Sequence, residues 1–166
     1  MTDPLVEGTS AHELVQLLTR RGSTLAAAES LTAGLFSATV AGVPGASAVL
    51  RGGMVVYATD LKSSLAGVDA DSLAADGPVS ESTAAALAEG ARMRCGSDWG
   101  VGLTGVAGPD QQDGHAVGTV YIGIAGPDAT RVNGVRLSGD RWTIRRDTVR
   151  EAVSLLLHRV SGNSAV

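Results

Sequence analysis

Residues 24–30, TLAAAES, run almost directly into residues 32–42, TAGLFSATVAG, and this pair of segments decides the class of fold. The first segment is short and apolar, which is typical of a buried β-strand. The second consists of small residues and predicts a helix packed tightly on a sheet, which the turn Val43-Pro44-Gly45 ends. A strand followed at once by a helix is the unit from which α/β folds are built.

The same alternation continues along the chain. One further helix is expected from Ser10 to Gly22, because Ser10 and Glu13 form a capping-box pattern. Others are expected around Lys62, from Ser80 to about Cys95, and near the C-terminus. Further strands are expected at 48–58, 99–108, 118–126 and 130–139, the last two as an antiparallel pair. We therefore predict a three-layer α/β/α sandwich on a mixed, mostly parallel sheet of about five strands, in a single domain over residues 1–166.

Composition narrows the class of protein. A net charge of −4 argues against broad electrostatic binding to nucleic acid or to an anionic membrane. No apolar run approaches the ~20 residues of a membrane span, and the N-terminal segment lacks the pattern of a signal peptide. The single cysteine, Cys95, excludes an internal disulfide and fits a reducing cytoplasm, which is the expected location.

Lys62 is the only lysine in the chain, because the other twelve of the 13 basic residues are arginine. Arginine stays charged at any biological pH, whereas a lysine amine loses its proton more easily when it is partly buried. Lys62 is therefore a candidate for a neutral amine. Drift in an arginine-rich sequence would leave the same pattern.

Hydroxyl and glycine residues gather where predicted strands end, which is where ligands bind in open α/β sheets. One such end carries Ser30, Thr32 and Gly34 at the start of a helix, whose free N–H groups favour an anion. Another carries Thr104 and Gly105 in a glycine-rich loop. Together these segments predict a site for a small anionic ligand.

Several kinds of chemistry are excluded by missing motifs. The chain has neither G-x-G-x-x-G nor G-x-x-x-x-G-K-[ST], its three histidines are far apart in sequence, and no G-x-S-x-G elbow is present. We therefore expect no metal and no Ser-His-Asp triad. Serine and lysine are left as nucleophile and base, because a desolvated lysine can deprotonate a hydroxyl. Spacing alone leaves Ser30 and Ser47 open as the nucleophile, with Tyr57 as a proton donor or relay.

Seven ordered motifs resemble the CinA C-terminal domain family over about residues 10–160. They are AESLTAG, VPGASAVLRGG, VVYATDLKSSLAGV, GPVSESTA, LTGVAGPD, VGTVYIGIAG and SGDRWTIR. The resemblance is to the free-standing members, the PncC-type nicotinamide-nucleotide amidohydrolases. These hydrolyse the carboxamide of nicotinamide mononucleotide to nicotinate mononucleotide and ammonia, in recycling of pyridine nucleotides. The resemblance implies no cofactor.

The resemblance also implies roles for individual residues. The family's serine nucleophile falls on Ser47, and its tyrosine and lysine fall on Tyr57 and Lys62. The substrate phosphate is then expected against Ser30, Thr32 and the helix start at Gly34, with Arg141 and Arg145 completing the anion site. Thr104 and Gly105 are expected to contact the nucleotide.

The chain departs from the family pattern at two loops, Leu31–Gly34 and Gln111–Ala116. These departures favour a second hypothesis, a nucleotide-binding or regulatory module that has lost turnover. For either function we expect a small-molecule nucleotide ligand and a homodimer in which the Ala-rich helices pack against another copy.

Overall fold

The computed structural model describes residues 3–162 and contains a five-stranded sheet in the order β2-β1-β3-β4-β5. The strands are β1 (Leu25–Glu29), β2 (Leu50–Val55), β3 (Trp99–Gly105), β4 (Thr119–Ala125) and β5 (Thr130–Arg136). β1 pairs in parallel with both β2 and β3, while β4 pairs antiparallel with β3 and β5. Among the described strands β4 alone runs against the others, so the predicted mixed, mostly parallel sheet is confirmed.

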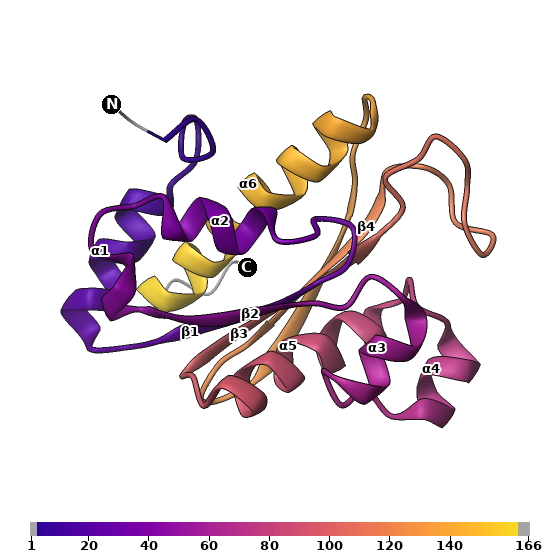
Figure 1. Cartoon of the computed structure of the whole chain (residues 1–166), viewed down its shortest axis with the longest axis horizontal. Helices are drawn as coiled ribbons and strands as arrows, with labels where there is room; N and C mark the ends of the chain where they lie inside the picture. The colour runs from indigo at the N-terminus through magenta and orange to yellow at the C-terminus, as the bar shows by residue number, and fades with distance from the viewer. Residues whose placement is uncertain (1–2, 163–166) are drawn as a thin grey trace.

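Helices cover both faces of the sheet (Figure 1). The helices are α1 (Ala11–Arg21), α2 (Leu35–Ala41), α3 (Thr59–Ser64), α4 (Ala70–Asp76), α5 (Glu81–Cys95) and α6 (Arg141–Ser161), with a 3₁₀ turn, η1 (Ala46–Ala48). α1, α2 and α6 lie on one face, and α3, α4 and α5 lie on the other (Figure 1). The three-layer architecture is therefore as predicted. α4 lies in a stretch that the sequence analysis assigned to no element.

Alternation along the central strands divides the core between the two faces. Val101 and Leu103 point from β3 toward α1 and α6, in the larger hydrophobic cluster. Gly100 and Gly102 face α5, where a Cβ atom on either would run into the backbone of that helix. The Ala-rich side of α5 is therefore buried against the protein's own sheet, with Ala84, Leu87, Ala88 and Ala91 fully covered. Ala85 and Ala86 of this helix are only partly buried, and the expected packing against another copy stays a prediction.

The helix ends agree with the sequence patterns, with one exception. Ser80 and Asp140 accept hydrogen bonds from the backbone N–H groups of Thr83 and Thr143 and so cap α5 and α6. The register between β1 and β2 skips Arg51, because Leu25 pairs with Leu50 and Ala26 with Gly52, as at a β-bulge. The capping box predicted at Ser10 is not formed, because the Ser10 side chain accepts no capping hydrogen bond from the described part of the chain.

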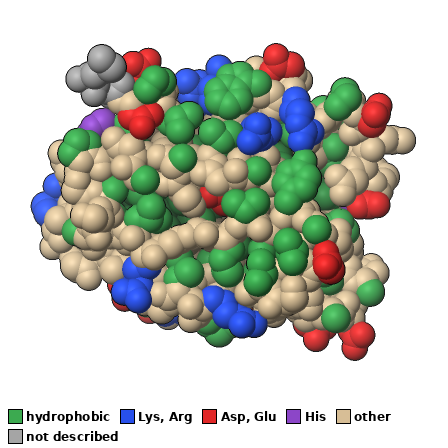
Figure 2. Space-filling view, viewed as in Figure 1, with side chains coloured by type: hydrophobic (Ala, Val, Ile, Leu, Met, Phe, Trp, Pro, Cys, Tyr) green, Lys and Arg blue, Asp and Glu red, His purple; other side chains and the backbone are tan. Residues whose placement is uncertain are grey.

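β2 forms one edge of the sheet, and it lies across the face shown in Figure 2. Hydrophobic side chains gather across the middle of this face, with lysine and arginine side chains above and below them (Figure 2). Val55, Tyr57 and Leu65, on and after β2, are each about half exposed. No helix within residues 3–162 is long and apolar enough to cross a bilayer.

Candidate active site

A pocket lies beyond the carboxyl ends of β1, β2 and β3, the position that open α/β sheets use for ligands. Its lining includes Ser30, Leu31, Tyr57, Thr59, Lys62, Pro78, Val79, Thr104 to Gly108, Asp110, Gln112 and Arg141. These residues come from five separate parts of the sequence, and the parallel direction of β1, β2 and β3 brings three of those parts to one edge.

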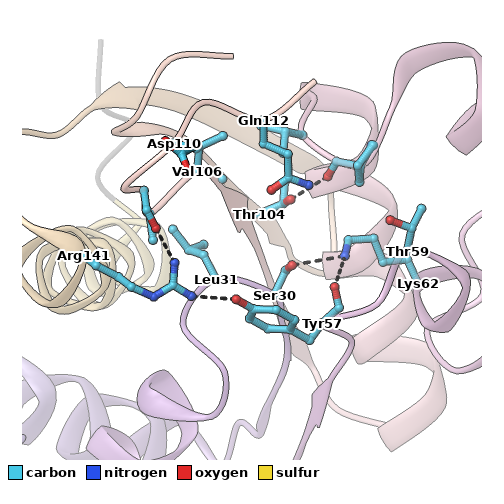
Figure 3. A pocket seen from close by; sticks show the side chains of 15 residues that line it. Ser30, Leu31, Tyr57, Thr59, Lys62, Thr104, Val106, Asp110, Gln112 and Arg141 are labelled. Carbon is cyan, nitrogen blue, oxygen red and sulfur yellow. Dashed lines mark hydrogen bonds between the residues drawn. The ribbon is translucent and has the colours of Figure 1, made fainter. Parts of the chain in front are cut away.

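Lys62 occupies the floor of the pocket and is 2% exposed. Its Nζ atom lies 3.1 Å from Ser30 Oγ and 3.3 Å from the carbonyl oxygen of Tyr57 (Figure 3). The carbonyl oxygen of Val56 lies 2.8 Å from the same nitrogen. No carboxylate within residues 3–162 forms an ion pair with it. Burial lowers the pKa of the Lys62 amine below its ordinary value of 10.5.

The three neighbours of Nζ suit both protonation states of the amine. A protonated amine donates one hydrogen bond to each of the three oxygens. A neutral amine donates to the carbonyls of Val56 and Tyr57 and accepts the hydrogen of the Ser30 hydroxyl. The arrangement therefore permits a proton to pass between Ser30 and Lys62 without movement of either side chain.

Ser47 does not share this pocket. It is exposed in η1, immediately before β2, whereas Lys62 follows β2 in α3. Six strand residues at ~3.3 Å each separate the two positions by about 20 Å. The expectation that Ser47 and Lys62 form a pair is therefore wrong. The serine that contacts Lys62 is Ser30.

Tyr57 contributes two different groups to the pocket. Its carbonyl oxygen contacts Lys62, while its hydroxyl accepts a hydrogen bond from Arg141 at 2.7 Å (Figure 3). Arg141 also donates to the carbonyl oxygen of Gly108 at 2.6 Å. Arg141 thus joins α6 to the two loops that form the pocket wall. The Tyr57 hydroxyl faces Arg141, so the structure gives no contact for the expected proton relay to Ser30 or Lys62.

The anion site expected at the start of α2 is filled by the protein itself. Glu29 is 1% exposed, and its carboxylate accepts hydrogen bonds from the backbone N–H groups of Gly34, Phe36 and Ser37 and from the Ser37 hydroxyl, at 2.7–3.0 Å. A buried carboxylate with four donors occupies the place where a phosphate was expected. Gly34, with φ of +94°, serves this turn and does not line the pocket.

Two other expected contacts are also turned away from the pocket. Thr32 is fully buried outside the lining, and its hydroxyl has no hydrogen-bond partner in the described part of the chain. Arg145 donates from Nε to the carbonyl oxygen of Leu31 at 2.8 Å and from Nη2 to that of Thr32 at 3.1 Å. Arg141 therefore lines the pocket, whereas Arg145 does not.

The glycine-rich loop after β3 is placed as expected. Thr104 and Gly105 line the pocket, and the Thr104 hydroxyl donates to the carbonyl oxygen of Pro78 at 2.6 Å. Asp110 and Gln112, which the sequence analysis did not select as site residues, line it too (Figure 3). Asp110 ends the motif Gly108-Pro109-Asp110 and Gln112 lies two residues beyond it, so this motif is the signal that would have found them. No group of three or more metal-ligating side chains occurs within residues 3–162.

Comparison with known proteins gives the family. The model of the CinA C-terminal domain matches residues 7–160. A CinA-like protein of Frankia casuarinae is 51% identical over 146 residues, which are 88% of this chain and 34% of that protein. The chain therefore belongs to the CinA C-terminal domain family. It spans about a third of the length of the curated relatives that it matches.

Solved structures of the same superfamily share the fold. The competence/damage inducible protein CihA of Agrobacterium tumefaciens superposes with a TM-score of 0.89 at 30% identity, covering 97% of this chain and 98% of that one. A competence-damaged protein (CinA) superfamily protein of Klebsiella pneumoniae gives a TM-score of 0.87 at 27% identity, covering 92% and 98%. The resemblance seen in the ordered motifs is confirmed.

Proposed function

We propose that the protein is an amidohydrolase that converts nicotinamide mononucleotide to nicotinate mononucleotide and ammonia. The observation that carries the proposal is the contact of 3.1 Å between the Ser30 hydroxyl and a buried lysine amine without a carboxylate partner in the described chain. This pair has the chemistry of an acyl-transfer site. The choice of nicotinamide mononucleotide as substrate is supported by the resemblance of the ordered motifs to the nicotinamide-nucleotide amidohydrolases of this family.

The proposed reaction begins with Lys62 as the base. The neutral amine takes the Ser30 proton while Oγ adds to the carboxamide carbon. The ammonium of Lys62 then returns that proton to the leaving nitrogen, so that ammonia departs and an ester with Ser30 remains. Water, deprotonated by Lys62, attacks the ester and releases the carboxylate and the free Ser30 hydroxyl.

Arg141 is the group that we assign to the substrate phosphate. Its guanidinium carries five N–H donors, of which two are used on Gly108 and Tyr57. Apart from Lys62 it is the only cation in the lining of the pocket. Since Glu29 already fills the start of α2, the phosphate is expected on the Arg141 side of the pocket.

The test is ammonia release from nicotinamide mononucleotide, compared across serine and lysine variants. Ser30→Ala is expected to lower kcat by a factor of about 10⁴ or more, because the nucleophile is gone. Ser47→Ala is the matched control and is expected to keep the wild-type rate. Lys62→Arg and Lys62→Met are each expected to lose about 10²- to 10⁴-fold, since neither side chain acts as a base at neutral pH. Retained activity in Ser30→Ala, or loss confined to Ser47→Ala, would refute the assignment.

A second function is favoured by one observation: the three oxygens around Lys62 Nζ also satisfy a permanently protonated amine. A lysine held in that state would bind a nucleotide without turning it over, as a regulatory module does. This alternative predicts saturable binding of nicotinamide mononucleotide in calorimetry. No ammonia should form during long incubation at any pH up to the pKa of a free lysine amine.

A further inference from the structure

A second groove lies between the edge strand β5 and the C-terminal half of α6. Its volume of about 420 Å³ falls within the ~300–1,000 Å³ that small-molecule sites occupy. Leu155 and Arg159, one helical turn apart, line it from α6, and Arg131 and Asn133 line it from the same side of β5. The groove is therefore built mainly by two regular elements.

This groove lies at the opposite end of the sheet from the active-site pocket. Trp99 lines the groove and begins β3, whereas Gly105 lines the pocket and ends the same strand. Six steps of ~3.3 Å separate these two residues by about 20 Å. Within the described chain no residue lines both cavities. A ligand in the groove would therefore meet none of the groups around Lys62.

Two arginines converge in the groove. Arg131 is exposed near the start of β5, and Arg159 is partly buried in the last turn of α6. Neither forms an ion pair with a carboxylate of residues 3–162. Burial lowers the pKa of the Arg159 guanidinium and the charge of Arg131 lowers it further, whereas the charge of Asp128 raises it. A bound anion would relieve the repulsion between the two guanidinium groups.

Both guanidinium groups keep donors free for such an anion. Arg159 donates from Nη2 to the carbonyl oxygen of Ala129 at 3.2 Å, a contact that holds its guanidinium beside the turn between β4 and β5. Four of its five N–H donors have no acceptor within residues 3–162. The planar fork of a guanidinium matches the oxygens of a phosphate.

The polar remainder of the lining limits the charge of the ligand. Asp128 adds one negative charge to the two positive charges of Arg131 and Arg159, so a single phosphate suits the groove better than a polyphosphate. The exposed carboxylate of Asp128 and the exposed amide of Asn133 are also able to bind the hydroxyl groups of a sugar.

The groove also has a rigid aromatic surface. Trp99 is partly buried, and its indole packs against Gly126, where a Cβ atom would come within 2.6 Å of the ring. Leu155 adds aliphatic surface from α6. An aromatic ring can stack on an indole that is held in this way.

We propose that this groove is a second ligand site, separate from the active site, and that it binds a nucleoside monophosphate. The phosphate lies between Arg131 and Arg159. The sugar hydroxyls contact Asp128 and Asn133, and the base lies on Trp99. The inference does not rest on the proposed amidohydrolase function, because none of these residues takes part in that reaction.

Adenosine monophosphate is the probe, and the fluorescence of Trp99 is the readout. The sequence has two tryptophans, so Trp142→Phe leaves Trp99 alone. We expect a saturable change in its emission as adenosine monophosphate is added. Adenosine, which lacks the phosphate, and ribose 5-phosphate, which lacks the base, are each expected to bind about tenfold or more weakly.

Arginine variants in this background locate the site. Arg131→Met and Arg159→Met are each expected to weaken binding of adenosine monophosphate by about tenfold or more, because each removes a charged donor to the phosphate. Arg136→Met is the matched control: Arg136 lies on the same strand, does not line the groove and donates to the Thr119 hydroxyl. It is expected to bind as the parent does, and so is Arg141→Met, which alters the active-site pocket.

Four results would overturn the inference. One is the absence of any saturable change up to about 5 mM adenosine monophosphate, which corresponds to negligible affinity. Another is equal affinity in Arg131→Met and Arg136→Met. A loss confined to Arg141→Met would mean that the nucleotide occupies the active-site pocket. Equal affinity for adenosine monophosphate and ribose 5-phosphate would reduce the groove to a simple anion site. Since ammonia release is not measured, failure of the proposed amidohydrolase function would leave each of these outcomes unchanged.

Discussion

Lys62 places a buried amine beside the Ser30 hydroxyl, and the proposed chemistry depends on the titration of that amine. Burial lowers its pKa, so the neutral amine is present at a lower pH than in free lysine. We expect kcat/KM for ammonia release to rise with pH along a single ionisation, with its midpoint below 10.5. A value of kcat/KM that does not change with pH from neutral pH up to 10.5 would exclude Lys62 as the base.

The same shift links stability to pH. The pKa of Lys62 is lower in the folded chain than in the unfolded chain, so the folded state binds this proton more weakly. The loss of folding stability caused by burying the protonated amine is therefore present in full below the pKa of Lys62 in the folded chain. It decreases as pH rises from that pKa toward 10.5. The difference in free energy of unfolding between the wild type and Lys62→Met should therefore move in favour of the wild type over that range. Urea unfolding at a series of pH values measures it.

Thr32 offers a test of an unpaired buried hydroxyl. Its Oγ1 atom has no partner within residues 3–162, whereas the equally buried Thr148 donates to the carbonyl oxygen of Ile144 at 2.7 Å. Thr32→Val is expected to leave the free energy of unfolding unchanged or to raise it by up to about 1 kcal/mol, while Thr148→Val should lower it by about 1 kcal/mol. Equal losses in the two variants would show that the Thr32 hydroxyl is paired in solution.

Which serine lies beside Lys62 could not be predicted from residue types or spacing. Ser30 and Ser47 both lie near glycines and near a strand, and only the direction of the strands distinguishes them. Ser30 follows β1 and Lys62 follows β2, so parallel pairing brings them to one edge, whereas Ser47 precedes β2 at the other. The contacts of Glu29 could not be predicted for a similar reason. Nothing in the sequence distinguishes a glutamate that caps the following helix from one exposed to solvent.

At the scale of elements, the close contact between β3 and α5 determines how the two layers meet. A Cβ atom on Gly102 would collide with the backbone of α5 at Ala84 and Ala88. We expect Gly102→Ala to lower the free energy of unfolding by at least about 2 kcal/mol, the effect of overpacking a rigid core. Gly52→Ala in β2 is the control, because its Cβ would meet only the Cys95 sulfur at an ordinary 3.6 Å. Chemical denaturation of both variants checks the contrast.

The elements themselves were largely predictable. Strands and helices were found because apolar runs, glycine turns and caps such as Ser80 are local signals. α4 was missed since its seven residues carry a weak apolar pattern, and its cap, Asp69, occurs in a stretch rich in other acidic residues. The Ser10 capping box failed because the pattern supplies the right residues without fixing their backbone angles.

For the whole molecule, the expected homodimer stays a prediction. Ala84, Ala88 and Ala91 of α5 are buried inside the protein, while the exposed edge and apolar side chains around β2 remain open to solvent (Figure 2). Light scattering during size-exclusion chromatography at micromolar concentration measures the mass directly. A mass near 16.7 kDa, that of one chain, would contradict the prediction.

The sequence by itself determined the α/β class, the family, the ends of the strands that carry the site and the importance of Lys62, because each is written in local patterns or in ordered motifs. The tertiary structure alone decided that Ser30 and not Ser47 meets that lysine, that Glu29 takes the place of a bound anion, and that Arg145 holds the turn instead of a ligand. These outcomes depend on which strand ends share an edge and on how hydrogen-bond donors are divided among competing acceptors, and both are settled only when distant segments are packed together.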